Sequence, residues 1–208
     1  MMKTPAKTKG RRGFTLIELV IVIAIIGIMA AVAFLSILHY RMVIRVNSSA
    51  RDLAGQIRQA RAQAIHDDAP ALVYFYPGGS SGDTYMVAKD NDENPTNGFT
   101  SGKTYKLEEN IVFGYYPTMQ NVPGHKSPGR NAACGVDINP SESCSRMYVY
   151  FRRDGGANYQ GVVYLAPYED VCPACTGKRD DRQRAVDWEG PTGRIRLWKW
   201  SRQTQSWY

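Results

Sequence analysis

An uninterrupted apolar segment near the N-terminus constrains this chain of 208 residues more than any other feature. From Phe14 to Leu38, the only ionisable side chain is that of Glu18. A helix of this length rises about 37 Å, which is enough to cross the ~30 Å hydrocarbon layer of a bilayer. The core of a globular domain of this size does not need such a helix. The sequence therefore predicts a single transmembrane helix over residues 14–38.

The residues before this helix predict its orientation. Five basic and no acidic side chains occur in the first 12 positions, whereas Arg41 and Arg45 follow the apolar segment. Because the flank richer in Lys and Arg stays in the cytoplasm, we expect a cytoplasmic N-terminus and a periplasmic C-terminal domain in a single-pass inner-membrane protein. An ordinary secretory signal has a shorter apolar region followed by its cleavage site. Here the small residue, Gly13, precedes the apolar region, so cleavage there would remove the leader and keep the helix.

The segment GRRGFTLIELVIVIAIIGIMAA closely resembles the type III signal of type IV pilins and type II secretion pseudopilins. This resemblance implies that a prepilin peptidase cuts between Gly13 and Phe14 and that the new amine of Phe14 is N-methylated. It also implies that Glu18, the fifth mature residue, pairs with the amine of a neighbouring subunit's Phe14 during assembly. Major pilins usually carry a proline about twenty residues after the glycine, but this chain has Leu35. The difference favours a minor pilin or a pseudopilin.

The position of Glu18 in the apolar segment predicts a functional role independently of the resemblance. A carboxylate in the hydrocarbon region costs roughly 2.5–3.5 kcal/mol on insertion scales, so a functional role with a cationic partner is expected. The alternative is that Glu18 lies at the cytoplasmic boundary and reaches the headgroups.

The pattern beyond the membrane predicts an α+β fold. Apolar residues recur at helical spacing from Val43 to Ala64, and Pro70 limits the helix. We therefore expect four parts: a cleaved leader (1–13), a transmembrane helix (14–38), an amphipathic helix (39–69) and an exported β-rich domain (70–208). The resemblance implies the type IV pilin fold, in which a long helix packs on an antiparallel sheet. Short segments rich in Val, Ile, Tyr and Trp predict strands at Ala71–Tyr76, Tyr85–Lys89, Ile111–Tyr115, Met147–Phe151, Val162–Ala166, Ala185–Trp188 and Arg194–Trp200.

Three motifs near the C-terminus resemble the GspH/FimT family of minor pseudopilins and minor pilins, which includes FimU. They are Phe151–Gly155, Gly161–Leu165 and Gly193–Trp198. The resemblance implies a subunit near the filament tip that primes or caps assembly of a type IV pilus, with roles in motility and adhesion, or of a type II secretion pseudopilus. The partners it implies are other minor pilins, the major pilin, the prepilin peptidase, the inner-membrane assembly platform and a tip adhesin.

Four cysteines, Cys134, Cys144, Cys172 and Cys175, follow the membrane segment. Export to an oxidising compartment favours disulfides, and proximity in the sequence favours the pairs Cys134–Cys144 and Cys172–Cys175. A four-thiolate zinc site and a Cys-x-x-Cys redox site are the alternatives. The wide spacing of the first pair disfavours zinc, and the loop around the second disfavours redox chemistry.

The basic and aromatic tail offers a second class of function. At strand spacing, Arg194, Arg196 and Trp198 share one face and Lys199 lies on the other. Guanidinium groups beside indole rings bind phosphates and stack on bases, and some FimT-like proteins serve as DNA receptors in natural transformation. The alternative is structural: the arginines pair with the nearby Asp187 and Glu189 while the tryptophans cover the sheet.

No pattern in the sequence predicts catalysis, a metal or a cofactor. The acidic stretch from Asp90 to Asn94 departs from a calcium loop, because Pro95 stands where a glycine is needed. His39, His66 and His125 lie in unrelated contexts, and no nucleophile motif or phosphate-binding loop occurs. Loss of the leader would also lower the formal charge from +7 to +2. We therefore expect a protein that works through subunit contacts and is not an enzyme.

Overall fold

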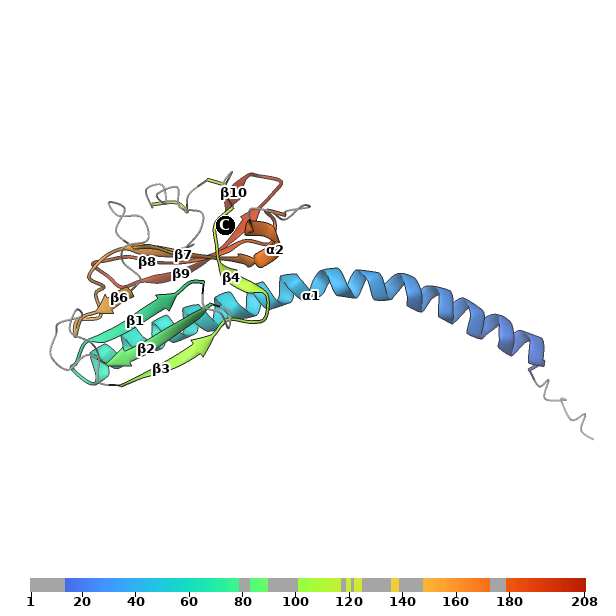
Figure 1. Cartoon of the computed structure of the whole chain (residues 1–208), viewed down its shortest axis with the longest axis horizontal. Helices are drawn as coiled ribbons and strands as arrows, with labels where there is room; N and C mark the ends of the chain where they lie inside the picture. The colour runs from blue at the N-terminus through green and yellow to red at the C-terminus, as the bar shows by residue number, and fades with distance from the viewer. Residues whose placement is uncertain are drawn as a thin grey trace, which may run out of the picture. The chain divides into compact units, whose positions relative to one another are not determined.

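The computed structural model of the protein describes residues 14–78, 83–89, 101–116, 119–120, 122–124, 136–138, 148–172 and 179–208. These residues form one long helix, α1 (Leu16–His66), a short helix, α2 (Tyr168–Val171), and two antiparallel sheets (Figure 1). The chain divides into two compact units, residues 1–41 and 42–208. α1 contributes to both units.

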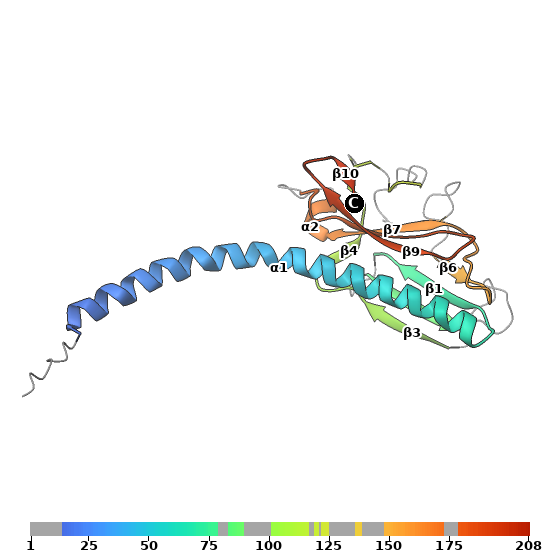
Figure 2. The ribbon, with the colours of Figure 1, turned by 180° about the vertical axis from the view of Figure 1, so that it is seen from behind.

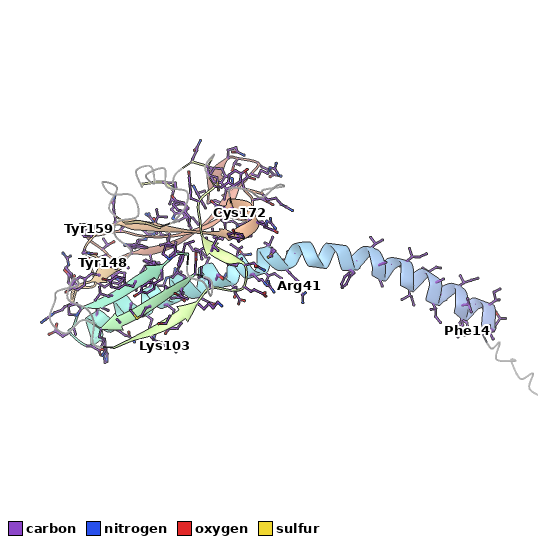
Figure 3. All side chains as sticks on the ribbon, viewed as in Figure 1. Phe14, Arg41, Lys103, Tyr148, Tyr159 and Cys172 are labelled. Carbon is purple, nitrogen blue, oxygen red and sulfur yellow. The ribbon has the colours of Figure 1, made fainter. Side chains whose placement is uncertain are left out.

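The first unit consists of the apolar part of α1. Residues Leu16–Phe34 have a mean hydropathy of 2.9, and none of this span is buried within the protein. Its side chains project from the helix without covering from other parts of the chain (Figure 3). The helix continues without interruption through Leu35, as expected in the absence of a proline there.

In the second unit, the C-terminal half of α1 packs into the core through one face. The predicted apolar stripe is confirmed, since all of its members but the half-buried Val43 are fully buried: Val46, Ala50, Leu53, Ile57, Ala60 and Ala64. The helix ends at His66, four residues before Pro70. A turn at Asp67 and Asp68 follows, in which Asp68 adopts a left-handed backbone with φ of 48°.

The first sheet has the strand order β3-β2-β1-β6 and lies against α1 (Figures 1 and 2). Alternate residues of β1, namely Ala71, Val73 and Phe75, enter the core that they share with the helix. The strands are β1 (Ala71–Tyr76), β2 (Thr84–Lys89), β3 (Ser101–Lys106) and β6 (Tyr148–Phe151).

The second sheet has the order β10-β9-β8-β7-β4, and β5 also pairs with β7. β7 is buried along its whole length because its two faces enter two different cores: Val163 and Leu165 join the core around α1, whereas Val162 and Tyr164 join an aromatic cluster with Trp200 and Trp207. The strands are β4 (Ile111–Phe113), β5 (Val136–Ile138), β7 (Gly161–Pro167), β8 (Arg184–Trp188), β9 (Ile195–Ser201) and β10 (Ser206–Trp207).

The expected α+β class, with a long helix on antiparallel strands, is confirmed, but the helix packs against two sheets and not one. Each predicted strand corresponds to an observed strand with shifted ends, apart from β1, whose bounds are as predicted. The sequence did not predict β5, β10 or α2. It also missed β3, in which Gly102, Lys103 and Lys106 have low strand propensity.

Candidate functional site

The beginning of α1 is closed by a reciprocal capping box. The backbone N–H of Glu18 donates to Oγ1 of Thr15 over 3.3 Å, and the backbone N–H of Thr15 donates to Oε2 of Glu18 over 3.2 Å. This pattern satisfies two of the backbone donors that every helix N-terminus leaves without partners. It holds the Glu18 carboxylate beside the peptide that follows Phe14. The side chain of Phe14 is exposed. Gly13 lies outside the described residues.

The surface of the first unit is suited to lipid and not to water. The span Leu16–Phe34 is long and apolar enough to cross a bilayer by length and composition, and its large side chains are exposed. An apolar surface of this extent on a chain in water would drive association. The first unit therefore presents a helix for a membrane, with one carboxylate in its first turn.

The structure places Arg196 in ion pairs with two carboxylates. Its guanidinium lies 2.7 Å from Oδ2 of the fully buried Asp187 and 3.1 Å from Oε1 of Glu189. The hydrogen bonds to Asp187 raise the pKa of Arg196 above its ordinary value, because they favour the charged form. The same guanidinium lies 5.4 Å from the ring of Trp198. Arg196 therefore makes the contacts expected if the tail is structural, in which its arginines pair with Asp187 and Glu189.

The other predicted DNA-binding residues occupy different environments. Arg194 is exposed and precedes β9, while Lys199 lies over the ring of Tyr208 at 5.4 Å from its centroid. Trp198 packs against the aromatic cluster, and its Nε1 is buried without a hydrogen-bond partner among the described residues. The structure therefore brings Arg196 and Trp198 together, and the DNA-binding role of the four residues stays a prediction.

Cys172 follows α2 directly, is buried, and takes part in a disulfide bond. Cys134, Cys144 and Cys175 lie outside the described residues, so the predicted pairing stays a prediction. A buried ion pair joins a residue before Cys172 to one after it. Arg182 donates to both carboxylate oxygens of Asp170, at 2.8 and 2.5 Å. Among the described residues, no group of three His, Cys, Asp or Glu side chains is arranged to bind a metal.

Two of the C-terminal motifs meet at the end of α1, which the sequence did not predict. Arg61 donates from Nε to the carbonyl of Gly155 over 2.9 Å and from Nη2 to the carbonyl of Thr192 over 3.1 Å. Gly193 follows with φ of 61°, and a Cβ there would overlap the carbonyl oxygen of Gly155. We call Arg61, Gly155, Thr192 and Gly193 the helix clamp. It connects α1 to the turn after β6 and to the turn before β9.

The arginines of α1 thus have different roles. Arg61 belongs to the helix clamp, and Arg45 lies 3.5 Å from a carboxylate oxygen of Glu109. Arg51 and Arg58 are exposed on the solvent side of the helix.

Residues 8–34 match the family described as the prokaryotic N-terminal methylation motif. A comparison with curated proteins found no match. Among solved structures, the chain is similar to the type IV minor pilin FimU of Pseudomonas aeruginosa, with 11% identity, a TM-score of 0.46 and coverage of 73% of this chain and 87% of FimU. It is also similar to the minor pseudopilin EpsH from the type 2 secretion system of Vibrio cholerae, with 12% identity, a TM-score of 0.45 and coverage of 74% and 97%.

The matched residues extend along the exposed apolar helix, which continues into an α+β domain. The predicted prepilin signal is confirmed by the motif, which extends through the capping box into the apolar helix.

Proposed function

We propose that this protein is a minor subunit of a type IV pilus that primes or caps filament assembly near the tip. The observation that carries the proposal is the N-terminal methylation motif on a helix whose apolar side chains from Leu16 to Phe34 are not buried by any described part of the chain. Such a helix anchors the precursor in the inner membrane before assembly and packs among the helices of other subunits afterwards. The same observation also suits a minor pseudopilin of a type II secretion system, which is the second candidate.

Processing comes first in this proposal. The basic leader stays in the cytoplasm, the peptidase cuts between Gly13 and Phe14, and the amine of Phe14 becomes methylated. The cut lies two residues before the first helical residue, Leu16, so the capping residue Thr15 stays with the mature chain. The mature helix therefore keeps its cap when it loses its leader.

Glu18 then guides assembly in the membrane. Its carboxylate already accepts hydrogen bonds from the backbone and side chain of Thr15, at 3.2 and 3.3 Å. A carboxylate has about four acceptor positions, so it can also accept a charged amine. A carboxylate in an apolar environment needs a cationic partner, and the N-terminal amine of a neighbouring subunit's Phe14 is such a cation. The ion pair between Glu18 and this amine sets the axial position of one subunit relative to the next.

The mass of the N-terminal peptide tests processing. The chain is produced in cells that assemble the filament, and the peptide is sequenced by mass spectrometry. We expect a peptide that begins at a monomethylated Phe14. A chain that retains its leader would refute the proposed function, whereas Gly13→Asp should block cleavage and serves as the reference for the unprocessed mass.

Incorporation tests the role of Glu18. Sheared filaments are probed for the wild type, Glu18→Ala and Glu18→Gln. We expect both variants to be inserted in the membrane and processed, but to be depleted from filaments, because neither retains the charge. Wild-type levels of Glu18→Ala in filaments would contradict the role. Loss of piliation or of secretion on deletion of the gene distinguishes the two candidate filaments.

A further inference from the structure

One edge of the first sheet is open. β3 pairs with β2 on one side, and no described strand pairs with its other side. The N–H of Leu107 donates to the carbonyl of Asp83 over 3.1 Å. With the register of the two strands, this bond shows which residues of β3 are hydrogen-bonded to β2. In an antiparallel pair, alternate residues direct their backbone groups to the partner strand. Gly102, Thr104 and Lys106 therefore direct their N–H and C=O groups away from β2.

The chain closes comparable edges elsewhere. At β6, the carbonyl of Tyr150 accepts from the N–H of Asn158 over 2.9 Å, and the N–H of Tyr150 donates to Oδ1 of the same residue over 3.1 Å. At β4, the N–H of Phe113 donates to Oδ2 of Asp83 over 2.5 Å. Proteins commonly close their edges because unpaired strands recruit other chains. No described residue closes β3 in this way.

A groove lies beside this open edge, between α1 and strands β2 and β3. It has a volume of about 430 Å³. From α1 it is lined by Gln56, Gln59 and Gln63, and from β3 by Lys103 and Tyr105. None of the three glutamine amides has a hydrogen-bond partner among the described residues. Each amide offers donors and an acceptor, which suits the polar backbone and side chains of an extended peptide.

The charged residues that line the groove indicate whether it suits an acidic or a basic peptide. Lys103, which is exposed on β3 (Figure 3), lies over the ring of Tyr105 at 5.1 Å from its centroid. Lys89 also lines the groove and pairs with Asp67, which is outside it. No carboxylate is among the described residues that line the groove. The groove is therefore positive and suits acidic side chains.

We propose that an extended acidic segment of a neighbouring subunit adds to β3 as a further strand. Its backbone pairs with Gly102, Thr104 and Lys106, and alternate side chains enter the groove toward Lys103 and Gln59. This inference rests on the proposed function, because it takes another subunit of the same assembly as the partner.

Thr104 allows a test that leaves the sheet intact. Because its N–H points away from β2, Thr104→Pro removes one donor from the open edge and none from the ladder. Thr104→Val keeps the donor and the strand propensity, so it is the matched control. The full chain carries a benzoylphenylalanine crosslinker at Gln59 and is produced in cells that assemble the filament. Crosslinked peptides are then identified by mass spectrometry.

We expect the crosslink to fall in an acidic segment of a neighbouring subunit. Thr104→Pro should reduce its yield about five- to tenfold, which corresponds to the loss of one well-formed hydrogen bond, and Thr104→Val should change it less than about twofold. Lys103→Glu should also reduce the yield, whereas Lys103→Arg should keep it. Equal resistance to proteolysis among the variants shows that the fold is retained.

Two results would overturn the inference. One is an unchanged crosslink in Thr104→Pro, and the other is the absence of any crosslink from Gln59 to another subunit while the chain is incorporated normally. Lysines on an edge strand also serve to prevent pairing, and the second result would assign Lys103 and Lys106 that role. Neither result affects the proposed function, which fails only when the chain is not processed or not incorporated.

Discussion

Replacing Gly193 by alanine should show how much the helix clamp contributes to stability beyond the backbone cost of a residue with positive φ. Gly193 has φ of 61°, a left-handed backbone that costs an L-residue roughly 1–2 kcal/mol. A Cβ there would also overlap the carbonyl oxygen of Gly155 and lie 2.8 Å from Nε of Arg61. Both groups belong to the same hydrogen bond, so the substitution must break or displace it.

The magnitude follows from these two effects. A hydrogen bond from a charged group contributes about 1.5–3 kcal/mol, so Gly193→Ala should lower the free energy of unfolding by about 2.5–5 kcal/mol in total. Gly78→Ala is the matched control, because Gly78 has φ of 80° but no atom within 4 Å of a Cβ placed there. It should cost only the backbone contribution, about 1–2 kcal/mol.

Urea unfolding of a chain that begins at Met42 provides the measurement, since residues 42–208 form one compact unit. The unfolding free energies of the two variants should differ by about 1.5–3 kcal/mol with unchanged dependence on urea. Equal losses for Gly193→Ala and Gly78→Ala would show that the close approach at the helix clamp is not a source of stability. Arg61→Met should reproduce most of the additional loss, because it removes the donor without a backbone change.

Three further predictions concern other polar contacts. Asp187→Ala should cost about 3–5 kcal/mol in urea unfolding because it removes a buried partner of Arg196, whereas the less buried Glu189→Ala should cost under about 1 kcal/mol, and equal costs would contradict this difference. Asp83→Asn should cost about 1–3 kcal/mol in the same assay, because its two oxygens each accept a backbone N–H and an amide has only one oxygen; an unchanged midpoint would contradict it. Thr15→Val should speed amide exchange in the first turn of α1 in detergent micelles by removing the capping oxygen, and unaltered exchange would show that the capping box does not stabilise this end.

The long helix could be predicted because its signals are local. The apolar residues between Val43 and Ala64 recur at helical spacing, and burial of that face follows from the pattern alone. The processing signal is equally local, since it consists of adjacent residues around Gly13 and Phe14. Strands rich in Val, Tyr and Trp were recognised for the same reason.

The remaining features depend on pairing between distant residues. Arg61 meets Gly155 and Thr192, which are 94 and 131 residues away along the chain, and no periodic pattern indicates that contact. The ion pair of Arg196 depends on register, because β8 places Asp187 directly opposite it. The sequence suggested this pairing only as one of two alternatives. β3 was missed because its lysines suit an exposed edge and not the interior of a sheet.

The helix clamp also determines how a pull on α1 would spread through residues 42–208. Force applied along the axis at the Met42 end would act in shear on the whole buried face from Val46 to Ala64, about 27 Å of helix. At the far end, the two hydrogen bonds of Arg61 would carry part of the load into both sheets. Contacts loaded together in shear must fail at nearly the same moment, unlike contacts that are peeled apart one by one. The joint between α1 and the two sheets should therefore resist a pull along the helix axis better than a pull that peels the helix away from the sheets.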